Sequence, residues 1–340
     1  MTAHSAPPHL DRRALLALGG AATLGAGLAG SGVTAPRPAA AQGLVQPDDP
    51  AETVRLWPGL PPGAPASLPR EVIVNRFTES GFQDRIATGI GTPAMTVFRP
   101  ARPNGAALLI IPGGGYVRVV IDREGFECAR QWAAAGVTCF VLRYRLPGDG
   151  WADRPRAALQ DAQRALRLIR ATAAAYGIDP ARIGVMGFSA GGHLAASLAT
   201  RHGEETYAPV DTADRLSARP DVAALLYPVI AMAAPHAHPG SRAALLGASP
   251  DPATEAANSP HTRVTAGTPP TFLLHAGDDP AVPVENSLMM YAALRTARIP
   301  AALHLFETGG HGFGLRRTEG LPVAAWPALF DRWAAAHGQM

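Results

Sequence analysis

Short, uninterrupted runs of apolar residues recur along this chain, and helical patterns separate them. The clearest runs cover residues 106–111, 182–186, 222–227 and 271–274. A strand buried on both faces of a parallel sheet has this continuous apolar character, whereas a strand with one face in water alternates. Residues 156–176 have the spacing of a long amphipathic helix. The pattern therefore predicts a mostly parallel sheet with helices on both faces.

The same patterns place the other elements. They predict strands at 72–74, 94–98, 137–142 and 302–306 and helices at 124–135 and 284–298. We expect the first two of these strands to form an antiparallel edge, and the central sheet to have about eight strands. Residues 230–268 are rich in Pro, Ala and His and have no readable period, so little or no cap domain is expected.

A serine lies at one of the predicted strand-to-helix turns. The sequence G-F-S-A-G at 187–191 follows the run 182–186 and precedes an apolar helical stretch. A strand, a G-x-S-x-G turn and a helix are typical of a nucleophile elbow, in which close contact between strand and helix requires the flanking glycines. The alternative is an ordinary turn whose serine caps the helix. Ser189 is the candidate nucleophile.

A loop of three glycines follows another buried strand. The run 106–111 ends in P-G-G-G-Y at 112–116. Free backbone N–H groups of such a loop can stabilise a developing oxyanion, together with the N–H of the residue after the nucleophile. The sequence therefore predicts an oxyanion hole made by Gly114, Gly115 and Ala190. The alternative is a flexible glycine linker.

Candidate acid and base residues follow the last two predicted strands. Of two adjacent aspartates, Asp279 fits the pattern D-x-x-V-P, and Asp278 is expected to have a structural role near the next helix. His311 lies in a Gly-rich loop after the final strand, whereas we expect His193, inside the helix after the serine, to serve in packing. The order Ser189, Asp279, His311 is that of the α/β-hydrolases.

Composition excludes several kinds of chemistry. The chain has 340 residues and a formal net charge of +3, and all 30 of its basic residues are arginine. Lysine-based catalysis is therefore excluded. The arginines are scattered among acidic residues, so no nucleic-acid site is predicted. Metal-ligand spacing is absent, and no metal or cofactor is expected. Cys128 and Cys139 are expected to be buried, small apolar residues rather than a disulfide.

The first residues resemble a twin-arginine (Tat) leader. Arg12 and Arg13 precede a weakly hydrophobic stretch that ends in small residues before Gln42. We expect a signal peptide at 1–41, so that the protein acts in the periplasm or outside the cell. The alternative is an uncleaved anchor, but many glycines make a poor spanning helix, and no stable membrane insertion is expected. A Pro-rich arm at 42–70 and a catalytic domain at 71–340 are expected to follow.

Four further residues near these loops have two interpretations each. Tyr116 is expected to line the acyl pocket or to pack in the core. Trp151 is expected to stack on a sugar ring or to anchor its loop. Asp122 and Glu124 could contact a sugar, but we expect them to cap the helix predicted at 124–135.

Taken together, the chain resembles a family of exported bacterial α/β-hydrolases that act as acetyl-xylan or carbohydrate esterases. The family is related to hormone-sensitive-lipase-type esterases, which carry His-Gly-Gly-Gly where this chain has Pro112 before its glycines. The resemblance covers about residues 54–335. It rests on segments 56–59, 112–116, 122–125, 142–146, 161–165, 187–193 and 310–313.

The resemblance implies an α/β-hydrolase fold and a secreted serine esterase that removes short acyl groups, acetyl above all, from xylan or xylo-oligosaccharides. The expected partner is a small or oligosaccharide ester. A general carboxylesterase, a lipase-like enzyme and a prolyl-oligopeptidase-like hydrolase are the alternatives within the enzymes. A binding protein that has lost catalysis is a further alternative, which the presence of Ser189, Asp279 and His311 disfavours.

Overall fold

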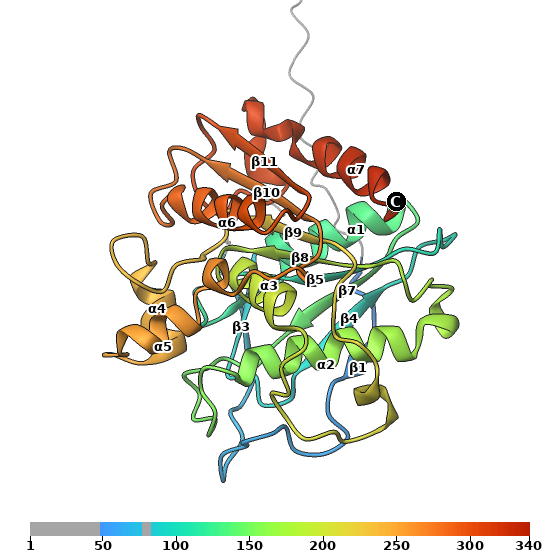
Figure 1. Cartoon of the computed structure of the whole chain (residues 1–340). Coiled ribbons are helices and arrows are strands. Elements are labelled where there is room, and N and C mark those ends of the chain that lie inside the picture. Colours follow the sequence, from blue (N-terminus) through green and yellow to red (C-terminus); the bar gives the residue numbers. More distant parts are fainter. Residues whose placement is uncertain (1–47, 77–82) are drawn as a thin grey trace, which may run out of the picture. The chain divides into compact units, whose positions relative to one another are not determined.

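The computed structural model of the chain describes residues 48–76 and 83–340 (Figure 1). The leader expected at 1–41 and the first residues of the expected arm lie outside the described residues.

An eight-stranded sheet crosses the middle of the described structure (Figure 1). Its order is β1-β4-β7-β5-β8-β9-β10-β11; β4 runs antiparallel to β1 and β7, and all other neighbours are parallel. The predicted size of the sheet and its mostly parallel character are confirmed. Its strands are β1 (Thr53–Arg55), β4 (Ala94–Phe98), β5 (Ala107–Ile111), β7 (Thr138–Arg143), β8 (Ile183–Phe188), β9 (Ala223–Leu226), β10 (Thr271–Ala276) and β11 (Ala301–Phe306).

The edge of this sheet differs from the prediction. Strand β2 (Val72–Asn75) belongs to a separate antiparallel sheet with β3 (Arg85–Thr88) and β6 (Val119–Val120). The place beside β4 is taken by β1, where Val54 pairs with Met95. Part of the segment expected to be an arm therefore completes the main sheet. All four residues of β2 are exposed, so the strand has no buried face that would require it to join the central sheet.

Helices cover both faces of the sheet. Gly187 and Phe188 are adjacent on β8, so they point to opposite faces. A Cβ at Gly187 would meet Ala195 of α3, whereas Phe188 contacts Trp326 of α7. Within the described residues, no helix combines the length and hydrophobicity needed to cross a bilayer. The α-helices are α1 (Glu127–Ala134), α2 (Ala157–Ala171), α3 (Ser189–Arg201), α4 (Pro239–Leu246), α5 (Pro252–Ala257), α6 (Glu285–Thr296) and α7 (Trp326–Ala336).

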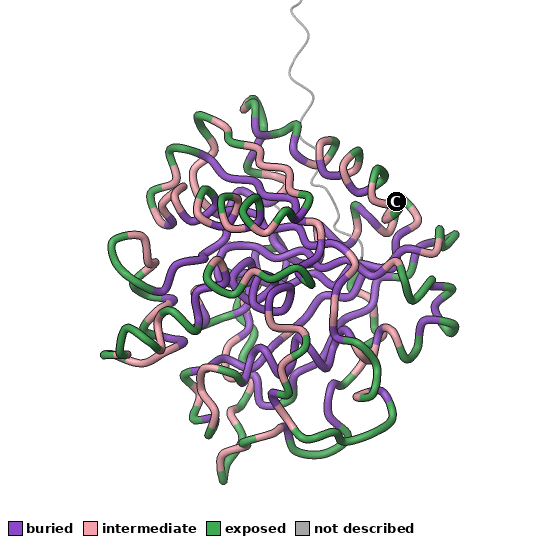
Figure 2. The backbone as a smooth tube through the Cα atoms, in the orientation of Figure 1, coloured by how far each residue is buried: buried purple, intermediate pink, exposed green. Residues whose placement is uncertain are grey.

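The core lies along the central strands, as Figure 2 shows by their buried backbone. Every residue of β5 and β8 is buried, which explains the continuous apolar runs that predicted them. Cys128 and Cys139 are buried and free, as expected. Burial raises the pKa of both thiols well above its ordinary value. They therefore act as packing residues and not as nucleophiles.

Two short helices, α4 and α5, occupy part of segment 230–268. The residue before each helix is its N-cap: His238 Nδ1 accepts from Ser241 N, and Asp251 Oδ1 accepts from Thr254 N. A proline follows each cap at the first helical position. Proline lacks an N–H, but the N–H of that position has no acceptor within the helix, so no hydrogen bond is lost. The segment therefore forms a small helical insertion instead of a large cap.

A buried ion pair ties the segment around β1 to the domain. Arg145 and Asp161 are both fully buried, and Arg145 Nε lies 2.9 Å from Asp161 Oδ1. The same carboxylate oxygen accepts a hydrogen bond of 2.8 Å from the indole of Trp57. Arg143, by contrast, pairs with the more exposed Glu71 at 2.9 Å. Both arginines therefore pair with carboxylates.

The change Asp161→Asn is expected to destabilise the protein by about 3–5 kcal/mol, because it leaves the Arg145 guanidinium buried beside a neutral group. The measurement is the midpoint of urea unfolding. The matched control is Glu71→Gln at the more exposed pair, for which we expect a loss below about 1 kcal/mol. Equal losses in the two variants would contradict the special role of the buried pair.

Candidate active site

Ser189 begins α3 directly after β8 and has a strained backbone. Its φ is +53°, in the left-handed region that non-glycine residues seldom adopt. The glycines around it are required by space. A Cβ at Gly187 would lie 2.3 Å from the carbonyl oxygen of Gly191, and one at Gly191 would lie 2.2 Å from that of Ile111. The turn therefore has the geometry of a nucleophile elbow.

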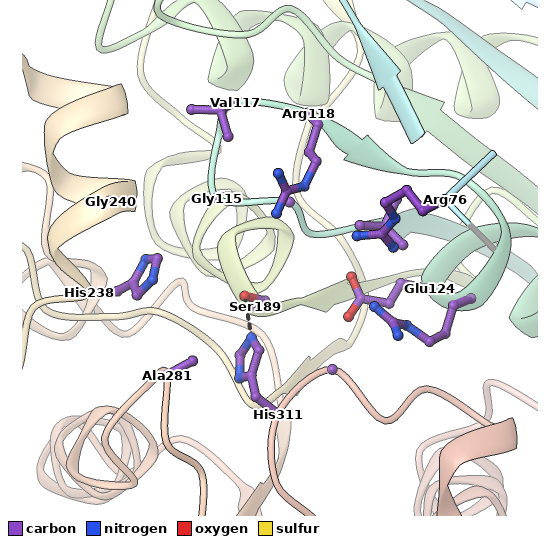
Figure 3. A pocket seen from close by; sticks show the side chains of 14 residues that line it. Arg76, Gly115, Val117, Arg118, Glu124, Ser189, His238, Gly240, Ala281 and His311 are labelled. Atoms are coloured by element: carbon purple, nitrogen blue, oxygen red, sulfur yellow. Dashed lines mark hydrogen bonds between the residues drawn. The ribbon is translucent and has the colours of Figure 1, made fainter. Parts of the chain in front are cut away.

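The structure brings the three predicted catalytic residues together. Ser189 Oγ lies 2.8 Å from His311 Nε2, and His311 Nδ1 lies 2.7 Å from Asp279 Oδ2 (Figure 3 shows the first contact). Ser189 follows β8, Asp279 follows β10 and His311 follows β11. The site therefore lies where the carboxyl ends of three parallel strands meet. A carboxylate only accepts hydrogen bonds, so Nδ1 carries the proton and Nε2 is free to accept the serine proton.

The Asp279 carboxylate is held on both oxygens. Oδ1 accepts from the backbone N–H groups of Ala281 and Val282 at 2.8 and 2.9 Å, and Oδ2 accepts from His311. Burial raises the pKa of the Asp279 carboxyl, but hydrogen bonds from His275 and His311 outweigh burial and leave it well below its usual range. Asp279 is therefore ionised at neutral pH and supports a positive charge on His311.

His275 is a neighbour of the acid that sequence reasoning did not single out. Its Nε2 lies 3.0 Å from the carbonyl oxygen of Val282 and 3.3 Å from Asp279 Oδ2, and its Nδ1 lies 2.8 Å from Ser287 Oγ. A carbonyl only accepts, so Nε2 carries the proton and Nδ1 accepts from the serine hydroxyl. In the sequence, His275 lies within a predicted strand. The available hint of its role is that it precedes Asp279 by four residues.

The other aspartate of the pair positions the histidine loop. Asp278 Oδ1 accepts a hydrogen bond of 2.7 Å from the backbone N–H of Gly310, next to His311. The structural role expected for Asp278 is therefore directed at this loop rather than at the following helix. The two neighbouring carboxylates therefore have different roles. Asp279 contacts the imidazole of His311, and Asp278 binds the backbone of the loop that carries His311.

The glycine loop lies beside the serine. Gly114 and Gly115, with φ of +132° and +67°, line a cavity together with Ser189. The N–H of Gly113 is already used, since it donates to Glu124 Oε2 at 2.9 Å. Ala190 lies in the first turn of α3, where a helix supplies no acceptor for its N–H groups. The three predicted oxyanion-hole residues thus flank the nucleophile.

Glu124 and Asp122 do not cap a helix, so that prediction is wrong. The chain there forms a π-helical turn, Asp122–Phe126, with no side-chain cap. Asp122 instead binds Arg85, accepting from its backbone N–H at 2.6 Å. Glu124 is buried, and its Oε1 accepts from the hydroxyl of Tyr227 at 3.1 Å while Oε2 accepts from the glycine loop. Both carboxylates therefore make tertiary contacts near the site.

Tyr116 and Trp151 are not brought to the cavity. Tyr116 is 1% exposed, and its hydroxyl lies 2.7 Å from Nδ1 of His193. Burial lowers the pKa of His193 to about 4, so this histidine is neutral and serves in packing, as expected. Trp151 is 4% exposed, and the centre of its ring lies 4.8 Å from the guanidinium carbon of Arg145. The two predicted substrate-binding residues are therefore corrected to core and loop-anchoring residues.

The cavity next to Ser189 has a volume of about 310 Å³. His238 lies at its wall, across from His311 in Figure 3. Its Nδ1 accepts from the backbone N–H of Ser241, so the proton of the neutral ring is on Nε2. Burial, with the nearby His311, lowers the pKa of His238. Sequence reasoning did not single out His238; the available hint was Pro239 directly after it, which indicates that His238 caps a helix.

This arrangement suits nucleophilic attack on a carbonyl. A hydroxyl, a base and an orienting carboxylate form a chain of hydrogen bonds beside N–H donors. Within residues 48–76 and 83–340, no cluster of three His, Cys, Asp or Glu side chains could hold a metal ion.

Comparison with known proteins shows the family of this chain. A model of the BD-FAE family matches residues 95–294, which is more than half of the chain. The chain is 34% identical to an acetylxylan esterase of Xylanibacter ruminicola over 229 residues, which are 66% of this chain and 44% of that protein. It spans less than half the length of the first curated relatives it matches. The family resemblance inferred from the sequence is confirmed.

Solved structures agree on the fold. An acetyl ester-xyloside bifunctional hydrolase from Caldicellulosiruptor lactoaceticus is 36% identical, with a TM-score of 0.69 over 88% of this chain and 99% of that one. An α/β hydrolase from a Medee basin deep-sea metagenome library is 29% identical, with a TM-score of 0.54 over 73% of this chain and 93% of that one. The predicted α/β-hydrolase fold is therefore confirmed.

Proposed function

We propose that this chain, which belongs to the BD-FAE family, is an exported serine carboxylesterase that removes short acyl groups, acetyl above all, from xylan or xylo-oligosaccharides. The observation that carries the proposal is the hydrogen-bond chain from Ser189 through His311 to Asp279 at the wall of the cavity. The carbohydrate substrate is supported by the names of two similar proteins, an acetylxylan esterase and an acetyl ester-xyloside hydrolase.

The proposed reaction begins with the attack of Ser189 Oγ on the ester carbonyl. His311 Nε2 lies within hydrogen-bond reach of this oxygen and accepts its proton as the new bond forms. The imidazolium that results is stabilised by the ionised Asp279 at 2.7 Å. The negative charge that develops on the carbonyl oxygen is received by backbone N–H groups of Gly114, Gly115 and Ala190. One such donor contributes about 3 kcal/mol to transition-state stabilisation.

The second half of the reaction regenerates the enzyme. His311 gives its proton to the departing alcohol oxygen, and the acyl group remains on Ser189 as an ester. Water then takes the place of the alcohol, and His311 removes its proton as the water attacks the acyl carbonyl. Collapse of this intermediate releases the carboxylic acid and returns the proton to Ser189 Oγ.

The experiment that tests this function measures acetate release from acetylated xylo-oligosaccharides and from 4-nitrophenyl acetate, with Ser189→Ala as the blank. We expect the wild type to hydrolyse both. We also expect kcat/KM to be higher for acetylated xylo-oligosaccharides than for acetylated cello-oligosaccharides of equal length, which serve as the matched control.

The possible results separate the parts of the proposal. Cleavage of 4-nitrophenyl acetate alone would leave the esterase mechanism standing and contradict the carbohydrate substrate, in favour of a general carboxylesterase. Cleavage of neither substrate would contradict the esterase proposal itself.

A further inference from the structure

Three arginines lie at the wall of the cavity that holds Ser189. Arg76, Arg118 and Arg123 line it, and Glu124 is the one carboxylate among the described residues of its wall. In Figure 3, Arg118 reaches from the loop after the glycines toward Ser189, and Arg76 lies on the same side above Glu124. The catalytic chemistry proposed above uses none of these arginines, so their place at the site requires a separate explanation.

Two of these arginines make no ion pair within the part of the chain that the structure describes. Among residues 48–76 and 83–340, the structure gives no carboxylate within 4.0 Å of the Arg118 or Arg123 guanidinium, and no hydrogen bond from either side chain. Arg123 is 8% exposed, and its Nε is buried without a hydrogen-bond partner among the described residues. A buried Nε–H in this position is unfavourable, because it has lost water and gained no hydrogen bond in return. A ligand that accepts hydrogen bonds would supply the arginines with the partner that they lack among the described residues.

The neighbouring charges leave the cavity wall positive. Arg76 is paired, at 2.8 Å, with Asp84, which lies outside the lining. Glu124 already accepts from the Gly113 N–H and from the Tyr227 hydroxyl, which occupies one lone pair on each oxygen.

We propose that the cavity takes esters whose alcohol half carries a carboxylate, bound by Arg118 and Arg123. The inference rests on the esterase function proposed above, in which the acyl group is small and leaves the remaining space to the alcohol half. Guanidinium groups bind carboxylates through paired, charge-assisted N–H···O bonds, which are stronger than bonds to neutral sugar hydroxyls. On a plant polysaccharide the corresponding group is the carboxylate of a uronic acid. The predicted substrate is thus an acetylated, acidic xylo-oligosaccharide.

The test compares two acetyl esters of nearly equal size whose alcohol halves differ in charge, 4-acetoxybenzoate and its neutral amide, 4-acetoxybenzamide. We expect the ratio of their kcat/KM values to favour the anion in the wild type. In Arg118→Gln we expect this ratio to fall about ten-fold, the loss of one charge-assisted interaction. Arg118→Lys keeps the charge but loses the paired geometry, so it should retain only part of the preference. Arg332→Gln removes an exposed arginine outside the cavity lining and should leave the ratio unchanged.

Two further measurements strengthen the test. Added salt should lower the preference for the anion, since the Arg118 side chain is exposed at the cavity wall and its attraction is screened. Acetylated xylo-oligosaccharides with a glucuronic acid side group should be better substrates than those without one. Both effects are expected to be weaker in Arg118→Gln than in the wild type.

The failures of the two proposals are distinguishable. Equal ratios in wild type and Arg118→Gln, with both esters hydrolysed, would overturn the carboxylate proposal and leave the esterase function standing. Absence of hydrolysis of either ester would contradict the esterase function. A charge preference that appears only for an acyl-side carboxylate, measured with 4-nitrophenyl hemisuccinate against 4-nitrophenyl butyrate, would overturn the assignment to the alcohol half.

Discussion

Replacement of Ser189 by alanine is expected to lower kcat about a million-fold, as the loss of a nucleophile does in serine hydrolases. The variant loses the oxygen that attacks the carbonyl, and His311 loses its hydrogen-bond partner at 2.8 Å. The N–H donors of the glycine loop do not depend on the serine side chain. Residual hydrolysis about 10³–10⁴-fold above the rate in water is therefore expected to persist. The measurement is steady-state hydrolysis of 4-nitrophenyl acetate at high enzyme concentration.

The control for this experiment is Ser197→Ala, which removes another buried hydroxyl from the same helix, α3. We expect this variant to keep a rate close to that of the wild type, since Ser197 does not line the cavity. Comparable thermal unfolding of the two variants would show that the helix is intact in both. A Ser189→Ala enzyme that retained a tenth of the wild-type rate would contradict the assignment of the nucleophile.

Replacement of Asp279 by asparagine is expected to lower kcat about ten-thousand-fold. The reason lies in the hydrogen bonds around the side chain. Oδ1 accepts from the N–H groups of Ala281 and Val282, so the amide oxygen of an asparagine would stay at that position. Its NH₂ group would then face Nδ1 of His311 and donate to it. The imidazole proton would move to Nε2, where it points at Ser189, and the ring could no longer accept the serine proton.

The adjacent aspartate supplies the matched control. Asp278→Asn keeps an oxygen that can accept from the N–H of Gly310, so we expect a loss in kcat of no more than about ten-fold. The measurement is kcat and KM of both variants on one ester at neutral pH. Losses of equal size would contradict the separate roles of Asp278 and Asp279.

The parts of this site that follow a buried strand could be predicted from the sequence. β5, β8 and β10 are buried along their whole length, so each leaves a largely apolar run that ends at or just before a site loop. Ser189 and Asp279 were found from short motifs placed directly after such runs. The edge of the sheet was not predictable in the same way. β1 has three residues and no buried position, and its place beside β4 depends on contacts far along the chain.

Residues whose role depends on tertiary contacts were also missed. Glu124 lies at the start of a helical segment, which suggested a cap, but its partners are Gly113 and Tyr227, 11 and 103 residues away. Tyr116 directly follows the glycine loop, yet its side chain turns inward to His193. Sequence shows which residues are neighbours along the chain, while the direction of a side chain leaving a loop is decided by what packs around it.

The contacts of Glu124 have a consequence for motion. Its two oxygens hold Gly113 in the oxyanion loop and the hydroxyl of Tyr227, and that hydroxyl also accepts from the N–H of Gly314, three residues after His311. The glycine loop and the loop that carries His311, which must act on the same carbonyl, are therefore linked by hydrogen bonds through the side chains of Glu124 and Tyr227. They should fluctuate as one body, and amide hydrogen exchange at Gly113 and Gly314 should accelerate together whenever either loop opens.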